Sequence, residues 1–348
     1  MHDTCLGDRC APIQSAHIGV PCVYNLDLIF SFGSAKCECE EYKDLIAIVQ
    51  GYSGLSLRPS SGKTRKTYEC NGVGYTGLIV GGARTKQGEF PHMAAIGWTN
   101  SKRVIEFKCG GSLISERYIF TAAHCSYDGE LGLPYLVRLG DQNLENKNDG
   151  AVPVEVNIKR FIKHPDYDSG TNKHDIALIE LAKDVRFNLT SIRPGCLKQG
   201  EYGGVNVTAT GWGKTGTFKQ TSDELMKVSL PVNWIGVCEN KLEHDYLDST
   251  RQICAGGIHG KDTCQGDSGA PIQVSHNEIP CVYNVIGLTS FGTGLCGKKA
   301  PAVYTKISYY LDWIEKIVWP QNIRNDSPSY YKTRRPTYRP AYSGPVWN

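Results

Sequence analysis

The chain has 348 residues, of which 40% are hydrophobic and 21% charged, an ordinary composition for a globular protein with a buried core. Its formal net charge of +3 gives no general reason to expect nucleic-acid binding. The sequence holds no apolar run of about 18 residues, so it predicts no membrane-spanning helix.

The cysteine content points to an oxidising compartment. Fourteen cysteines are many for a cytosolic chain and indicate a disulfide framework, so we expect a secreted, extracellular protein. The first residues, Met1 to Cys5, show neither the basic nor the apolar stretch of a signal peptide. This conflict indicates that the chain as given begins in the wrong place, or is a fragment or a mature form.

Residues 1–37 contain a partial copy of a segment near the other end of the chain. Residues 3–37 align with residues 262–296 without a gap, and 19 of the 35 positions are identical. A piece of a barrel this short cannot bury its own strands. We therefore interpret residues 1–37 as the remnant of a neighbouring duplicated gene fused to this one. A functional module is the alternative.

Residues 79–319 consist of short apolar runs separated by Gly, Pro, Asn and Asp. This pattern is typical of an all-β barrel or sandwich. The clearest runs are residues 94–98, 118–121, 136–139, 177–179 and 205–208.

One helix is predicted near the end of this region. Apolar side chains recur there with helical spacing, and Ser308 is a suitable N-cap. The residues are Tyr310, Leu311, Ile314, Ile317 and Val318. Beyond it, residues 320–348 are rich in Pro, Ser and Arg and hold too few apolar side chains to offset the entropy of ordering. We expect a disordered basic tail.

Three short motifs predict nucleophilic catalysis. His124 lies in Thr-Ala-Ala-His-Cys, Asp175 in His-Asp-Ile-Ala-Leu, and Ser268 in Gly-Asp-Ser-Gly. A serine hydroxyl needs a base to remove its proton, and histidine titrates in the right range. A buried carboxylate can then fix the imidazole tautomer. Each motif alone is weak, but the three in this order on an all-β pattern indicate a catalytic triad.

These motifs resemble those of chymotrypsin-like serine proteases of the trypsin type, and more narrowly of arthropod clip-domain proteases of the snake and venom-protease type. The resemblance covers residues 79–319. It implies two six-stranded antiparallel β-barrels with a C-terminal helix, and a triad in the cleft between them. The stretches that carry it are residues 78–82 (Leu-Ile-Val-Gly-Gly), 89–98, 109–115, 262–269 and 311–317.

The resemblance also implies a zymogen. Cleavage between Leu78 and Ile79 would free an α-amino group that turns inward and pairs with Asp267, which organises an oxyanion hole of Gly266 and Ser268. A buried ammonium–carboxylate pair can hold one of two loop arrangements, and the ammonium exists only after the cut. Because Leu78 precedes the bond, we expect an activating protease that prefers leucine, and no self-activation.

The same resemblance places a substrate pocket around Asp262, Ser290, Gly292 and Ala302. A buried carboxylate at Asp262 would pair with a substrate Arg or Lys, and Gly292 would leave the pocket wall open to a long side chain. Ala302 stands where glycine is the commonest residue, so its methyl group is expected to narrow the pocket and shift the balance between Arg and Lys. Ala270 replaces another common glycine, away from the triad.

The resemblance further implies disulfides between Cys109 and Cys125, Cys238 and Cys254, and Cys264 and Cys296. Cys196 would tether the light chain that activation creates, with Cys70 as its partner and Cys39 as the runner-up. Cys281 receives no partner. The six cysteines before residue 79 lack the adjacent pair that ends a clip domain. We therefore assign no clip domain and take residues 38–78 as a light-chain and activation linker.

No cofactor or metal is predicted. Cys37 and Cys39 are not followed by a second close pair, as a zinc site would require. Residues 141–146 hold oxygen ligands where some relatives bind calcium, but the spacing is incomplete and a solvated loop is the favoured interpretation.

The sequence therefore predicts a secreted trypsin-like endopeptidase in an extracellular cascade or a venom. By resemblance, its partners would be downstream zymogens, an upstream activating protease and serpin-type inhibitors. The main alternative is a non-catalytic homologue that acts as a binding cofactor. Such homologues usually lose the triad serine, a loss seen here only in the N-terminal copy, where Arg9 stands in its place. A chimeric gene product that does not fold as written is a third possibility.

Overall fold

The computed structural model describes residues 47–50, 65–68 and 82–320, without residues 189, 198–199, 201, 217–218, 244–246, 277–278, 280 and 294–295. The interpretations of residues 1–37 and 321–348 lie outside the described residues, as do Leu78, Ile79 and Cys70. Within the predicted linker, β1 (Ala47–Gln50) pairs with β2 (Arg65–Tyr68) in antiparallel fashion.

The first barrel is closed and has six strands. Its order is β4-β5-β6-β9-β8-β7, and each neighbouring pair is antiparallel. Its members are β4 (Met93–Thr99), β5 (Ile105–Leu113), β6 (Tyr118–Thr121), β7 (Leu136–Leu139), β8 (Val154–Lys163) and β9 (Ala177–Leu181).

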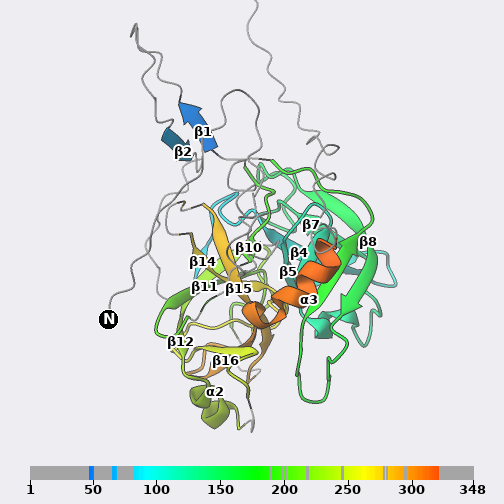
Figure 1. Cartoon of the computed structure of the whole chain (residues 1–348). Helices are drawn as coiled ribbons and strands as arrows, with labels where there is room; N and C mark the ends of the chain where they lie inside the picture. The colour runs from blue at the N-terminus through cyan, green and yellow to red at the C-terminus, as the bar shows by residue number, and fades with distance from the viewer. Residues whose placement is uncertain are drawn as a thin grey trace, which may run out of the picture. The chain divides into compact units, whose positions relative to one another are not determined.

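The second barrel also closes on six strands, because β15 pairs with β16 at the ends of the path β15-β14-β11-β12-β13-β16. Two short strands add to it: β3 (Ala83–Arg84) on β12, and β10 (Cys196–Leu197) parallel to β15. The prediction of two six-stranded antiparallel barrels is confirmed (Figure 1). The barrel strands are β11 (Asn206–Gly211), β12 (Met226–Asn233), β13 (Gln252–Gly256), β14 (Pro271–Ser275), β15 (Tyr283–Phe291) and β16 (Pro301–Lys306).

The predicted C-terminal helix is α3 (Leu311–Val318). The N-cap prediction was wrong: Ser308 lies inside a preceding 3₁₀ turn, η2 (Ile307–Tyr310), and Tyr310 caps α3 without a side-chain hydrogen bond. The sequence pattern also missed α2 (Ile235–Leu242), because this short helix buries only Gly236 and Cys238 and shows no clear apolar stripe. Among the described residues, no helix is long and apolar enough to cross a membrane.

One apolar cluster joins the two barrels and the C-terminal helix. Phe120 and Leu178 come from the first barrel, Val285 and Leu288 from the second, and Ile314 from α3. All five are buried and in the same cluster. Burial of each such side chain contributes roughly 1.5–3 kcal/mol, so this cluster fixes how the barrels face each other. The relative position of the barrels in turn determines the geometry of any site between them.

A histidine is buried just before β4. His92 is 1% exposed, and its ring lies 5.4 Å from that of Tyr283, centroid to centroid. Burial lowers the pKa of His92 to about 4, the nearby Gln273 side chain opposes the shift, and the charge of Arg193 adds to it. The folded protein therefore holds this imidazole neutral.

This burial predicts a loss of stability in acid. Between pH 6.5 and pH 4 the unfolded chain binds a proton at His92 that the folded chain does not, so the free energy of unfolding falls as the pH falls. We expect a His92→Asn variant to lack this contribution, which is on the order of 3 kcal/mol. The measurement is urea unfolding of both proteins from pH 4 to pH 7. A constant difference between them across that range would contradict the prediction.

Candidate active site

His124 lies in η1 (Ala123–Ser126), the 3₁₀ turn that follows β6. Its backbone N–H donates to Oδ1 of Asp175 at 3.0 Å, and its Nδ1 lies 2.8 Å from Oδ2 of the same carboxylate. The two contacts hold backbone and ring together, and they fix Nδ1 as the protonated nitrogen. The imidazole is 28% exposed, so its other nitrogen, Nε2, remains available as a base.

Asp175 receives hydrogen bonds from both barrels. The Ser290 hydroxyl of β15 donates to Oδ2 at 2.5 Å, and Thr305 of β16 donates to the Asp175 carbonyl oxygen at 2.8 Å. Burial by itself would raise the pKa of Asp175, but the hydrogen bonds and charge of His124, together with the Ser290 hydroxyl, lower it below its usual value. The carboxylate is therefore ionised, although its side chain has no exposed surface.

Ser268 lies in the turn before β14, against the first barrel. The Gly110 N–H of β5 donates to the Ser268 carbonyl oxygen at 2.8 Å. The next residue, Gly269, has φ +72°, and a Cβ there would overlap Thr121 and approach the backbone of Gly110. This close approach brings Ser268 beside the turn that carries His124. No hydrogen bond joins the Ser268 hydroxyl to His124 in the described structure, and such contacts are often looser before substrate binds.

Two backbone N–H groups at this turn, those of Gly266 and of Ser268 itself, have no acceptor among the described residues. Gly266 has φ +97°, which suits a residue without Cβ. Neither the Gly266 N–H nor the Ser268 N–H donates to any acceptor in the described part of the chain. Such a pair of free donors around a nucleophile is the arrangement that stabilises a developing oxyanion.

Asp267 lies between these donors and turns its carboxylate toward the loop that follows β11. Its Oδ1 accepts from the Gly213 N–H at 2.8 Å, and its Oδ2 from the Cys264 N–H at 2.9 Å. Burial raises its pKa to about 6, and no cationic side chain among the described residues pairs with it. Asp267, Gly82 and Asp262 line one cavity of about 110 Å³. The cavity therefore connects the start of the two-barrel domain with both carboxylates.

Of the four predicted pocket residues, Ser290 contacts the candidate triad, and the other three do not. Burial raises the pKa of Asp262 to about 7, and hydrogen bonds from the Gly297 N–H, at 3.3 Å, and from the backbone of Thr263 oppose the shift. Gly292 and Ala302 face each other, because a Cβ on Gly292 would lie 3.4 Å from that of Ala302. Ser290 instead turns its side chain to Asp175, a contact that the sequence motif did not reveal.

Ala270, the other departure from the usual pattern, belongs to the core. It is 1% exposed, and a Cβ on Gly110 would overlap its methyl group. The methyl therefore occupies the contact between the barrels, away from the cavity at Asp262.

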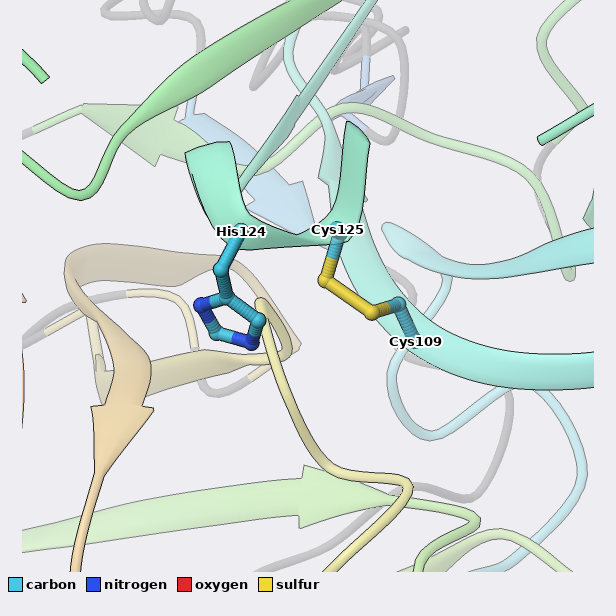
Figure 2. Close-up of side chains that lie close together, drawn as sticks. All are labelled: Cys109, His124 and Cys125. Atoms are coloured by element: carbon cyan, nitrogen blue, oxygen red, sulfur yellow. A yellow bond between two sulfur atoms is a disulfide. The ribbon is translucent and has the colours of Figure 1, made fainter. Parts of the chain in front are cut away.

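The three disulfides implied by the resemblance are all present: Cys109–Cys125, Cys238–Cys254 and Cys264–Cys296. The first lies beside His124, as Figure 2 shows. Cys109, Cys125 and His124 are also the only described group of metal-ligand types close enough to hold an ion. Both sulfurs are committed to the disulfide and cannot act as thiolate ligands, so these residues do not fit a metal site.

A side-chain cation occupies the loop considered for calcium. The Arg138 guanidinium contacts Asp141 at 3.2 Å and Glu155 at 2.7 Å, and donates to the Leu144 carbonyl oxygen at 2.8 Å. It also stacks over the Phe107 ring, 4.6 Å from its centroid. A positive charge is thus already supplied to these oxygens from within the chain.

The comparisons with known proteins agree with this geometry. A family model described as trypsin matches residues 79–314. Serine protease snk of Drosophila melanogaster is 41% identical over 78% of this chain, and the match spans 64% of that relative's length. A venom protease of Bombus pensylvanicus is 39% identical over 67% of this chain and 96% of its own length. Phenoloxidase-activating factor 3 of Holotrichia diomphalia is 36% identical over 71% of this chain and 72% of its own length.

Because both His124 and Ser290 contact Asp175, we expect substitutions at Asp175 and at Ser290 to reduce hydrolysis to different extents. Asp175→Asn removes the charge and favours the wrong imidazole tautomer, so we expect kcat to fall about 10⁴-fold. Ser290→Ala leaves the carboxylate but removes one donor, so a fall of about 10-fold with unchanged KM is expected. The control is Asp184→Asn, an exposed carboxylate paired with Arg117. Equal losses in the Asp175 and Asp184 variants, measured with a peptide ester, would contradict this assignment.

Proposed function

Since the chain belongs to the trypsin family of serine proteases, we propose that it is the zymogen of an endopeptidase that cleaves after arginine or lysine. The observation that carries the proposal is the joint placement of one base and one nucleophile. His124 is held by the ionised Asp175, and the N–H groups of Ser268 and of Gly266, two residues before it, have no acceptor in the described structure.

The roles of these side chains follow from their atoms. Nε2 of His124 takes the proton of the Ser268 hydroxyl as the oxygen attacks the substrate carbonyl, and it then gives that proton to the leaving amine. Asp175 stabilises the imidazolium formed in between. The Gly266 and Ser268 N–H groups donate to the oxyanion. Water repeats the sequence on the acyl-enzyme and regenerates the serine.

Asp262 supports the preference for a cationic side chain. Its buried carboxylate has no cationic partner in the described structure. A substrate guanidinium or ammonium group would supply one and would stabilise the ionised form. Gly292 leaves room for the long side chain, and the Ala302 methyl opposite it would favour one of the two cations.

Activation is proposed at the bond between Leu78 and Ile79, which lies outside the described residues. The cavity shared by Gly82 and Asp267 supports this proposal. Ile79 is three residues from Gly82, and an extended chain of that length spans about 10 Å. The new α-amino group would pair with Asp267, lower the pKa of this carboxyl from about 6 and hold the oxyanion turn in place.

The setting of the enzyme is proposed from its cysteines and its relatives. Disulfides among the described residues suit a secreted protein. One relative is named a venom protease and another a phenoloxidase-activating factor. We therefore place this chain in an extracellular cascade, with a leucine-preferring activator upstream, a zymogen substrate downstream and serpin-type inhibitors. We propose that it needs no metal or cofactor, since Arg138 supplies the positive charge in the loop considered for calcium.

The proposal predicts activity that depends on the cut. The full chain would carry an enteropeptidase recognition sequence, four Asp and one Lys, in place of residues 74–78. Arg, Lys and Phe peptide substrates would be assayed before and after enteropeptidase treatment. Hydrolysis of the Arg or Lys substrate is expected only after the cut, and Ser268→Ala in the same background should abolish it. A folded, cut protein with no activity on any substrate would instead favour the non-catalytic binding cofactor.

The pocket predicts a separate change in specificity. Asp262→Ser removes the charge that would pair with the substrate cation, so kcat/KM for Arg and Lys substrates should fall by at least about 10³-fold while the triad stays intact. Ala302→Gly widens the same pocket. It should change the ratio of kcat/KM for Arg substrates to kcat/KM for Lys substrates, while the two values added together change little. An unchanged Arg preference in the Asp262 variant would show that another residue selects the cation.

A further inference from the structure

Two buried cysteines of the two-barrel domain are bonded to cysteines outside it. All eight cysteines among the described residues are in disulfides. Six of them form the three pairs within the domain. Cys196 and Cys281 remain, each 2% exposed.

Neither cysteine belongs to the three disulfides that join described residues, so the partner of each lies outside the described residues. Cys196 of β10 lies opposite Asn284 of β15, and Cys281 comes three residues before Asn284.

The two cysteines nevertheless share one edge of the second barrel. β10 runs beside β15, and the Arg193 side chain, three residues before Cys196, donates to the Cys281 carbonyl oxygen at 3.4 Å. The Arg193 N–H in turn donates to the Pro91 carbonyl oxygen at 3.0 Å, which ties this edge to the start of the first barrel. Any chain bonded to both cysteines would be held at two neighbouring points.

The remaining cysteines all precede the domain, since none follows Cys296. Four of the six lie in the N-terminal copy, where Cys5 and Cys37 correspond to the bonded pair Cys264 and Cys296. A matching bond within the copy would leave Cys10 and Cys22 to pair there. Cys39 and Cys70 are then the two that remain, and fourteen cysteines would form seven bonds.

We propose that the linker is tethered to the protease domain twice, with Cys39 and Cys70 bonded to Cys196 and Cys281 at the β10–β15 edge. The proposal rests on the proposed function, and the second tether adds to the sequence-based expectation that Cys196 alone holds the light chain. One bond lets a segment pivot about its attachment, whereas two bonds fix its direction across the edge. After the activating cut, the light chain would thus remain in a set position while the new terminus at Ile79 moves.

The direct test is a disulfide map of the full chain, unfolded and alkylated at low pH without reduction. Cleavage after Glu278 and Tyr283 isolates Cys281 in a peptide of residues 279–283, and cleavage after Glu38 separates Cys37 from Cys39. We expect Cys281 in a peptide linked to Cys39 or Cys70, and Cys196 linked to the other. A free Cys281 thiol, a bond between Cys281 and Cys196, or a bond from either to the N-terminal copy would overturn the proposal.

A second measurement uses the chain with the enteropeptidase sequence. After the cut, denaturing gels without reductant should show the light chain still attached in Cys196→Ser and in Cys281→Ser, and released only in the double variant. Release from Cys196→Ser alone would overturn the second tether. Neither measurement needs catalysis, so loss of the proposed activity and loss of the second tether are separate results. The map uses the unaltered chain and does not depend on the folding of any variant.

Discussion

A buried carboxylate at the junction of two barrels is the constraint on which the site depends. Asp175 has no exposed side-chain surface, so its charge must be compensated from within the protein. The backbone and ring of His124 supply donors from the first barrel, and the Ser290 hydroxyl supplies one from the second. Because these donors belong to separate barrels, the carboxylate stays ionised and oriented only while the barrels hold their mutual position.

A second pair of buried carboxylates shows the opposite arrangement. Asp262 and Asp267 line one cavity and have no cationic partner among the described residues, so burial raises the pKa of both. A buried carboxylate without a cationic partner is unfavourable in its ionised form and lowers the stability of the folded protein, and a bound cation removes this penalty. The proposed function assigns the substrate side chain to Asp262 and the new α-amino group to Asp267. Binding and activation would thus use the same physical principle at two neighbouring sites.

Much of this arrangement was predictable from the sequence, because it depends on local patterns. The short apolar runs indicated the strands, and the motifs around His124, Asp175 and Ser268 indicated the chemistry. The weaker predictions failed where local pattern carries little information. Ser308 suits a helix start, but the backbone makes a 3₁₀ turn there, and α2 has too little buried surface to show a periodic signal. Cys281 had no partner in the motif pattern, yet it is disulfide-bonded in the fold.

The sequence by itself determined the family, the strand pattern, the candidate triad and the cysteine count, since each depends on residue types and short motifs that can be recognised without knowledge of the fold. Only the tertiary structure decided which groups meet. It turned the Ser290 hydroxyl toward Asp175, packed Ala270 against Gly110, and placed Arg138 among the oxygens of the candidate calcium loop. It also brought Cys196 and the β15 segment to one edge. These contacts join residues that are distant along the chain, and their geometry exists only after the barrels close and pack.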